Sequence, residues 1–256
     1  MGITFVHVTD AYQDDLDSLS MIANLAKNKG LRDKDDFWEN VILNHILSLY
    51  NNISLSEKQL LKIHNERTIK EFIRKKLEFD DNFTVNHLLT VELEPQNKHS
   101  ELQGFYDIKI RSSLWNSYFS FECKCIDNTQ VSILEYVYNP NKIKKKKKFE
   151  DGGLFRFLIN KYSTDKKFGG MIGFLQNGNF NQIKNSIFSQ IKGLRLSSNS
   201  KYFGILEKEG ILETNIPYYF QSSHSRYDIS ENRECEPIRI HHFLYNFTEQ
   251  ETVYFS

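Results

Sequence analysis

Two consecutive stretches of alternating polar and apolar residues constrain the fold of this chain more than any other feature. They cover residues 104–111 and 118–125, and both are rich in aromatic and β-branched side chains, which favours strands. Because side chains alternate along a strand, Glu122 and Lys124 point to one face of the second stretch and its apolar residues point to the other. The pattern therefore predicts two strands that each have one polar face.

The connection between these stretches is short enough for a hairpin. Residues 112–117 can close it, and the two polar faces then lie side by side. In this arrangement we expect Asp107 on the first strand to converge with Glu122 and Lys124 on the second. The hairpin would thus gather two carboxylates and one ammonium group at one place.

Such a group of side chains suits the hydrolysis of a phosphodiester. Two carboxylates a few ångströms apart repel each other unless a cation or a proton lies between them. Mg²⁺ takes oxygen ligands, often one or two carboxylates together with water and substrate phosphate. A neighbouring lysine is a compact charge that can hold a water or neutralise a phosphate. These properties together favour metal-assisted hydrolysis.

The motif resembles that of the PD-(D/E)XK nucleases, which have restriction-endonuclease-like folds. It consists of Asp107 and, further on, Glu122, Cys123 and Lys124, while Tyr106 stands where the family has proline. The resemblance implies that both carboxylates bind the metal, that the backbone carbonyl of Cys123 adds a ligand, and that Lys124 acts on the water. The alternative is an amphipathic hairpin with a surface salt bridge, because the E-x-K pattern alone is common.

The resemblance also implies a fold and a biological role. The fold is α/β, with a restriction-endonuclease-like core of a helix, three antiparallel strands, a helix and a parallel strand. The implied activity is that of a cytoplasmic, Mg²⁺-dependent DNA endonuclease, with Mn²⁺ as the alternative ion. Its implied role is in antiviral defence or restriction, together with an ATPase, helicase or sensor subunit. Further similarity to small defence-associated proteins of this kind lies in residues 154–157, 161–162, 169–173, 220–226 and 238–247.

The remaining chain of 256 residues predicts elements that fit this core. We expect a helical accessory region over residues 1–53, packed on a nuclease-like domain over residues 54–256. A capping box at Ser54 and Glu57 predicts a helix start. The predicted helices are 16–27, 36–50, 54–77, 151–162 and 180–191, and the further strands are 3–8, 83–94, 169–175, 218–226 and 238–247.

Further carboxylates could support the site. Glu66 lies near the apolar face of the helix that precedes the strands, so it is either an auxiliary acid or part of a solvent-side ion network. Glu92 and Glu94 either reach the site or are simply exposed. Glu39 belongs to no motif, and we expect it to be solvated.

A run of lysines between residues 142 and 148 is the most basic segment of the chain. Consecutive lysines repel one another and stay solvated. The run is therefore either a flexible loop or a contact with the phosphate backbone, which would give salt-dependent affinity. The side chains that we expect to contact nucleic acid are those of Lys144, Lys145, Lys146, Arg156, Lys161, His224 and Arg226.

Composition narrows the class of protein. The formal net charge is zero, with 33 basic and 33 acidic residues, so nucleic-acid binding would need a local basic face. We expect no membrane span, because no run of about 18 apolar residues occurs, and no signal peptide. Three cysteines favour reduced thiols in the cytoplasm.

Other chemistries fit the sequence less well. A zinc site at His224, Cys235, His241 and His242 is disfavoured, because adjacent histidines on a strand face opposite sides. No G-x-S-x-G or P-loop motif is present. Two alternatives to a DNA nuclease stay open: a nuclease-fold protein that binds a partner without cutting, and the same chemistry on RNA.

Overall fold

The computed structural model describes most of the chain in seven segments. They are residues 34–94, 106–112, 117–144, 147–163, 166–194, 210–228 and 231–248, without the side chains of residues 34–38, 117 and 144. The strand and helix predicted over residues 3–8 and 16–27 lie outside this part.

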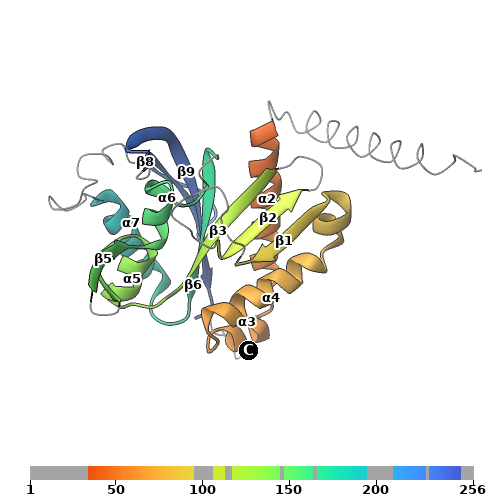
Figure 1. Ribbon diagram of the computed structural model, residues 1–256. Coiled ribbons are helices and arrows are strands. Elements are labelled where there is room, and N and C mark those ends of the chain that lie inside the picture. Colours follow the sequence, from red (N-terminus) through yellow and green to blue (C-terminus); the bar gives the residue numbers. More distant parts are fainter. Residues whose placement is uncertain are drawn as a thin grey trace, which may run out of the picture.

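A mixed seven-stranded sheet forms the centre of the protein, in the order β1-β2-β3-β6-β9-β8-β7 (Figure 1). β1, β2 and β3 are antiparallel, β3, β6 and β9 are parallel, and β8 and β7 continue antiparallel. The α/β class predicted from the sequence is confirmed. The strands are β1 (Leu89–Leu93), β2 (Ile108–Ser112), β3 (Ser117–Ile126), β6 (Phe168–Leu175), β7 (Gly210–Glu213), β8 (Tyr219–Asp228) and β9 (Arg233–Asn246).

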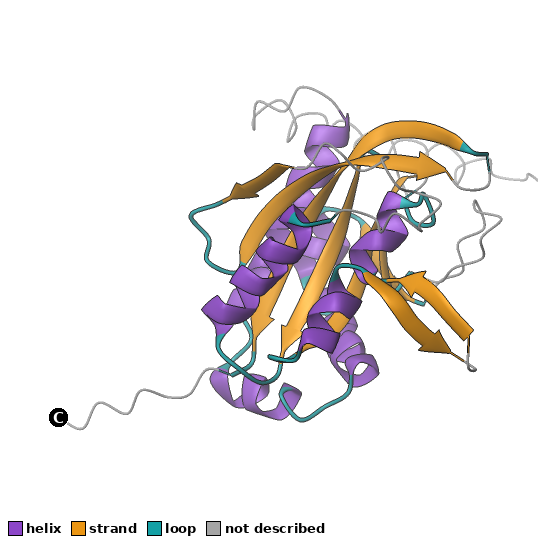
Figure 2. Ribbon diagram, turned by 90° about the vertical axis from the view of Figure 1, so that its left-hand side faces the viewer, coloured by secondary structure: helices purple, strands orange, loops and turns teal. Residues whose placement is uncertain are grey.

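Helices cover both faces of this sheet (Figures 1 and 2). α2 and α4 bury their apolar side chains with one face, and α5, α6 and α7 with the other, so the core has two layers. The helices are α2 (Lys34–Asn51), α3 (Leu55–Leu61), α4 (Glu66–Glu78), α5 (Gln130–Tyr136), α6 (Gly153–Leu158) and α7 (Phe180–Lys192).

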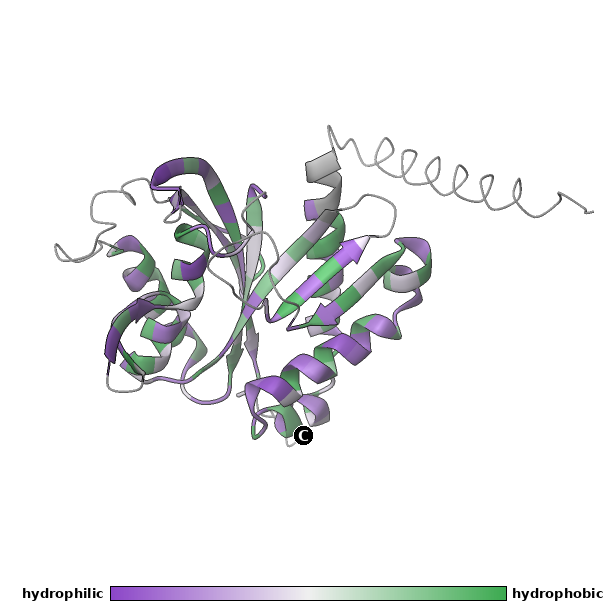
Figure 3. Cartoon of the chain, viewed as in Figure 1, coloured by the Kyte–Doolittle hydropathy of each residue, from purple (hydrophilic) through white to green (hydrophobic). Residues whose placement is uncertain are grey.

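β6 shows how the sequence specifies this arrangement. All eight of its residues are buried, as expected of a parallel strand that is covered on both faces. Its partner β3 alternates: Phe119, Phe121 and Cys123 enter the layer under α2 and α4, whereas Glu122 faces the layer of α5 and α6. Figure 3 shows the resulting mixture of apolar and polar positions along the sheet.

The lysine run lies in strands at every position that the structure describes. It forms a separate two-stranded hairpin of β4 (Asn139–Lys144) and β5 (Lys147–Asp151), which lies beside the helices α5 and α6 rather than in the main sheet (Figure 2). Pro140 lies near the start of β4, a position that tolerates proline in a two-stranded ribbon.

Two predicted elements differ from the observed ones because of local polar groups. The strand predicted from residue 83 begins only at Leu89, because a short π-helix, η1 (Asn82–Asn86), takes up the residues before it. At the start of this helix the Asp80 side chain accepts a hydrogen bond from the Asn82 N–H. Such side-chain bonds compete with strand pairing. The helix predicted over residues 54–77 is two helices, α3 and α4, since Asn65 caps α4. The capping box at Ser54 is confirmed.

The helix predicted over residues 151–162 is α6 alone. Asn160 has a positive φ of 55°, a conformation that ends helices, and the N–H groups of Lys161 and Tyr162 both donate to the Arg156 carbonyl. Asp151 lies in β5 instead.

α2 shares the core of the sheet. Its Ile42 and Ile46 are fully buried in the same cluster as β2 and β3. The expectation that Glu39 is solvated is wrong, because Glu39 is 7% exposed and bonds to Arg239 and His241 on β9. No helix within the described residues is long and apolar enough to cross a membrane.

Candidate functional site: a carboxylate and lysine cluster

The hairpin of β2 and β3 brings Asp107, Glu122 and Lys124 together, as the sequence predicts. Asp107 directly precedes β2, and its N–H donates to the Phe121 carbonyl, so it lies beside Glu122 on β3. Its Oδ2 atom accepts a 2.8 Å hydrogen bond from the Cys123 N–H. The backbone of β3 therefore fixes the position of this carboxylate.

Three oxygen atoms surround the ammonium group of Lys124. Nζ donates to Glu122 Oε1 at 2.6 Å and to the Cys123 carbonyl at 2.8 Å. Asp107 Oδ2 lies 3.9 Å from the same nitrogen. They belong to the three groups that the resemblance would assign to a metal, and here they surround one protein cation.

Glu122 is a fully buried carboxyl group with one oxygen atom left over. Oε1 accepts from Lys124 and from Arg156 Nη1, each at 2.6 Å, whereas Oε2 has no hydrogen-bond partner among the described residues. Burial raises the pKa of Glu122 to about 7, against the opposing charge of Lys124. A buried polar atom without a partner is costly, so this oxygen is ready to accept a proton or bind a cation.

Lys70 on α4 is a member of the site that sequence reasoning missed. Its side chain is 4% exposed, and its Nζ lies 2.7 Å from Asp107 Oδ1, 3.1 Å from Glu94 and 3.6 Å from Glu66. Burial alone would lower the pKa of Lys70, but Asp107 outweighs this effect and raises it. The sequence alone could not reveal that three acids surround Lys70, because this arrangement depends on how α4 packs on the sheet.

Glu66 and Glu94 therefore both reach the cluster, through Lys70. Desolvation raises the pKa of Glu66 despite the nearby charge of Lys124. Glu92 on β1 instead forms an ion pair with Arg111 on the neighbouring β2, with 3.3 Å between Glu92 Oε2 and Arg111 Nε.

Arg156 is committed to carboxylates of the protein. It binds Asp151 through two nitrogens, at 2.8 and 3.0 Å, and Glu122 through a third. Burial would raise the pKa of Asp151, but these bonds outweigh it and hold the pKa below its usual value. Lys142 adds a 3.0 Å ion pair to Asp151. Arg156 thus supports Glu122 and is not a free phosphate contact.

Gly153 lets α6 approach this group. A Cβ atom at Gly153 would lie 3.2 Å from Glu122 Cγ and 2.6 Å from Met171 Cε. The absence of a side chain at the start of α6 therefore leaves the space in which Glu122 lies.

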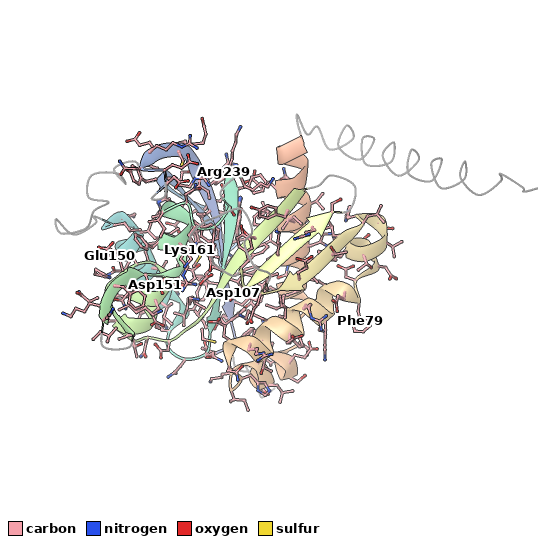
Figure 4. All side chains as sticks on the ribbon, in the orientation of Figure 1. Phe79, Asp107, Glu150, Asp151, Lys161 and Arg239 are labelled. Atoms are coloured by element: carbon pink, nitrogen blue, oxygen red, sulfur yellow. The ribbon has the colours of Figure 1, made fainter. Side chains whose placement is uncertain are left out.

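The other predicted nucleic-acid contacts are placed differently. His224 and Arg226 are 1% and 3% exposed, and Arg226 donates to the carbonyls of Ser163 and Glu236. Because both side chains are buried, neither lies where it could contact a phosphate, contrary to the prediction. Lys161 is half-buried in the turn after α6 (Figure 4). Lys145, Lys146 and the side chain of Lys144 lie outside the described part.

The residues fit a hard metal ion only with help from the backbone. Among the described residues, no three His, Cys, Asp or Glu side chains form a group that could hold a metal. Asp107, Glu122 and the Cys123 carbonyl supply three oxygens, and Mg²⁺ characteristically completes its coordination with water and substrate. Glu122 Oε2, which has no hydrogen-bond partner among the described residues, is a further oxygen that could bind the ion.

No family model matches the chain, and no match was found among curated proteins or solved structures. The fold and the site define an α/β protein in which acids and lysines from α4, β3 and the start of β2 form one cluster, with Arg156 of α6 bound to it.

Proposed function

We propose that this protein is a Mg²⁺-dependent nuclease of the PD-(D/E)XK type that hydrolyses phosphodiester bonds of DNA. The observation that carries the proposal is the convergence of Asp107 Oδ2, Glu122 Oε1 and the Cys123 carbonyl on one cationic nitrogen. The order α4, β1, β2, β3, α5, α6, β6, with β3 and β6 parallel, supports a restriction-endonuclease-like core.

The roles follow from what each group can do. Asp107 and Glu122, with the Cys123 carbonyl, would hold the ion, and the ion would supply Lewis acidity at the scissile phosphate. Lys124 stays protonated, because Glu122 and Asp107 raise its pKa although burial would lower it. As a cation it can orient the attacking water and neutralise the phosphate. Glu66 is the auxiliary acid.

A role as the effector of a prokaryotic defence or restriction system remains part of the proposal. It rests on the resemblance of the sequence alone, and a partner subunit would provide ATP-dependent or sensing functions. Mn²⁺ is the alternative ion.

Cutting of supercoiled plasmid tests the activity. We expect nicked or linear product with Mg²⁺ and none with EDTA, and loss of cutting in Glu122→Gln and Lys124→Ala. Lys192→Ala, which removes an exposed lysine at the end of α7, is the matched control. Substantial Mg²⁺-dependent cutting that persists in either site variant would refute these roles.

A second candidate is a binding protein that keeps the fold without cutting. It is favoured by the fact that Lys70, Lys124 and Arg156 already pair with the carboxylates of the cluster. Binding of Mn²⁺, measured by water proton relaxation, separates the two candidates. A nuclease should bind the ion, and Asp107→Asn should weaken this binding. A protein that only binds a partner should show no such metal site. A parallel assay with structured RNA tests the same chemistry on the other nucleic acid.

A further inference from the structure

The outer part of the β4–β5 hairpin has no role in the proposed catalysis. The hairpin is a two-stranded ribbon outside the main sheet, and an isolated ribbon of this kind is marginally stable in water. Figure 3 colours much of it as hydrophilic. Lys147 and Lys148 are exposed, and between the lysines of β4 stands Ile143, which is 67% exposed.

The strand register makes this composition unfavourable for the hairpin alone. Ile143 pairs with Lys148, so an exposed apolar side chain stands opposite an exposed charged one. Neighbouring lysines such as Lys147 and Lys148 repel each other, and a large exposed apolar side chain adds nothing to the folding of the hairpin. An anionic partner would remove both disadvantages, since it would neutralise the lysines and cover Ile143.

The base of the hairpin is tied to the carboxylate cluster by a chain of ion pairs. Lys142 on β4 contacts Asp151 at the end of β5, at 3.0 Å, and Asp151 holds Arg156, which in turn holds Glu122. Figure 4 labels Asp151, which belongs to this chain of ion pairs, and Asp107, which belongs to the carboxylate cluster. A polyanion held by the hairpin would therefore lead towards Glu122.

We propose that the β4–β5 hairpin is an arm that binds duplex DNA, with Lys147 and Lys148 on the phosphates and Ile143 in a groove. A two-stranded ribbon fits the major groove of B-form DNA, and apolar side chains on such arms also enter the minor groove. The major groove of A-form RNA is too narrow for side chains to enter. Duplex DNA would be the substrate of the proposed nuclease, so this assignment rests on that function, although binding by the arm does not require cutting.

Binding of a labelled 30-base-pair DNA duplex in EDTA, followed by fluorescence anisotropy over a range of salt concentrations, tests the arm. Each lost phosphate contact lowers the slope of log K against log salt by about 1, so Lys147→Ala/Lys148→Ala should lower it by about 2. Ile143→Ser should weaken duplex binding with the slope unchanged, because it removes no charge. Both changes are at exposed positions, and circular dichroism checks the fold.

Matched variants elsewhere on the surface complete the design. Lys75→Ala/Lys192→Ala removes two exposed lysines outside the arm, and Leu212→Ser removes a side chain that is 61% exposed on β7. Both should bind as the unchanged protein does. An unchanged slope in the arm lysine variant overturns the inference, as does equal weakening by Ile143→Ser on single-stranded DNA or on duplex RNA.

The same experiment separates this inference from the nuclease proposal. Plasmid cutting together with an unchanged slope in the arm variant would overturn the arm and leave the nuclease. Arm-dependent duplex binding without any Mg²⁺-dependent cutting would support the arm and overturn the nuclease.

Discussion

At the scale of single residues, Lys70 is the contact that holds Asp107 in place from the helix side. Asp107 Oδ1 accepts a hydrogen bond from Lys70 Nζ, and Oδ2 accepts one from the Cys123 N–H. The carboxylate is therefore held by α4 and by β3 at the same time. Its second oxygen is thereby turned towards Lys124. A buried lysine among three acids also keeps the negative charge of the cluster small before any metal or phosphate arrives.

We expect Lys70→Met to destabilise the protein by about 3 kcal/mol, because removing one partner of a buried ion pair leaves uncompensated charge. Urea unfolding measures this change. Lys75→Met, at an exposed lysine of the same helix, is the control and should stay within about 0.5 kcal/mol. A loss in Lys70→Met no larger than in the control would show that the ion pairs of Lys70 contribute little.

His224 predicts a pH dependence of stability. It is buried, its Nε2 bonds to Ser222 Oγ at 2.7 Å and its Nδ1 has no partner among the described residues. Burial lowers the pKa of His224 to about 3, below the ordinary value of about 6.5. The unfolded chain thus binds a proton that the folded protein does not bind, and stability falls as the pH drops from about 6.5 towards 3.

The measurement is the free energy of unfolding between pH 6 and pH 4. In His224→Gln the slope against pH should be smaller by about 1.4 kcal/mol per pH unit. The buried His242, which bonds to Ser222 and Tyr136, remains in both proteins. His64→Gln, at an exposed histidine of the turn before α4, controls for the loss of an imidazole, and an equal change in both variants would contradict the prediction.

At the scale of elements, the junction between β5 and α6 depends on Gly152. Its φ of 147° lies where side chains are rarely tolerated, and a Cβ atom would lie 2.5 Å from the Val137 carbonyl oxygen. The glycine lets the chain leave the hairpin and enter α6 directly beside the segment that leads into β4. Asp151 and Gly153, on either side of it, are thereby both placed near Glu122.

Gly152→Ala should therefore destabilise the protein by about 2 kcal/mol, because the backbone conformation is strained for any residue with a Cβ atom. Gly210→Ala is the matched control, since nothing lies within 4 Å of a Cβ there. Thermal unfolding compares the two. If Gly152→Ala is tolerated as well as Gly210→Ala, the turn does not constrain α6.

The sequence was informative where one local pattern decides the outcome. The alternation in β3 identified the faces of Glu122 and Phe121, and the uniformly apolar β6 was predicted almost to its ends. Prediction from the sequence failed where the environment of a residue is set by segments far away in the chain. The burial of Glu39 depends on Arg239 and His241, 200 and 202 positions away, and Lys70 is part of the site only because α4 packs over β1 and β3.

At the scale of the whole molecule, α2 and the sheet share one hydrophobic layer. Ile46 is fully buried, and the same cluster extends through β2 and β3 to Phe243 on β9. Tyr245 on β9 also donates to the Ile46 carbonyl at 2.8 Å. The segment from residue 39 to residue 53 is therefore integrated with the core of the predicted nuclease domain.

We accordingly expect Ile46→Ala to lower the stability of the entire described fold by about 3 kcal/mol, through the cavity that it leaves. Near- and far-ultraviolet circular dichroism should report one coincident unfolding transition. Leu60→Ala, at a leucine of α3 that is 60% exposed, should change little. Two separate transitions in the Ile46→Ala protein would show that α2 unfolds independently.

The position of β9 has a consequence for synthesis of the protein on the ribosome. β9 is the last described strand along the chain, yet it lies inside the sheet, where β6 pairs with one of its edges and β8 with the other. Until residues 233–246 have emerged, β6 keeps an open edge and β8 has no neighbour on its inner side. A nascent chain can gather Asp107, Glu122 and Lys124 early, but it cannot complete the layer beneath them until this strand arrives. Chaperones that protect open strand edges should therefore matter most during the final part of translation.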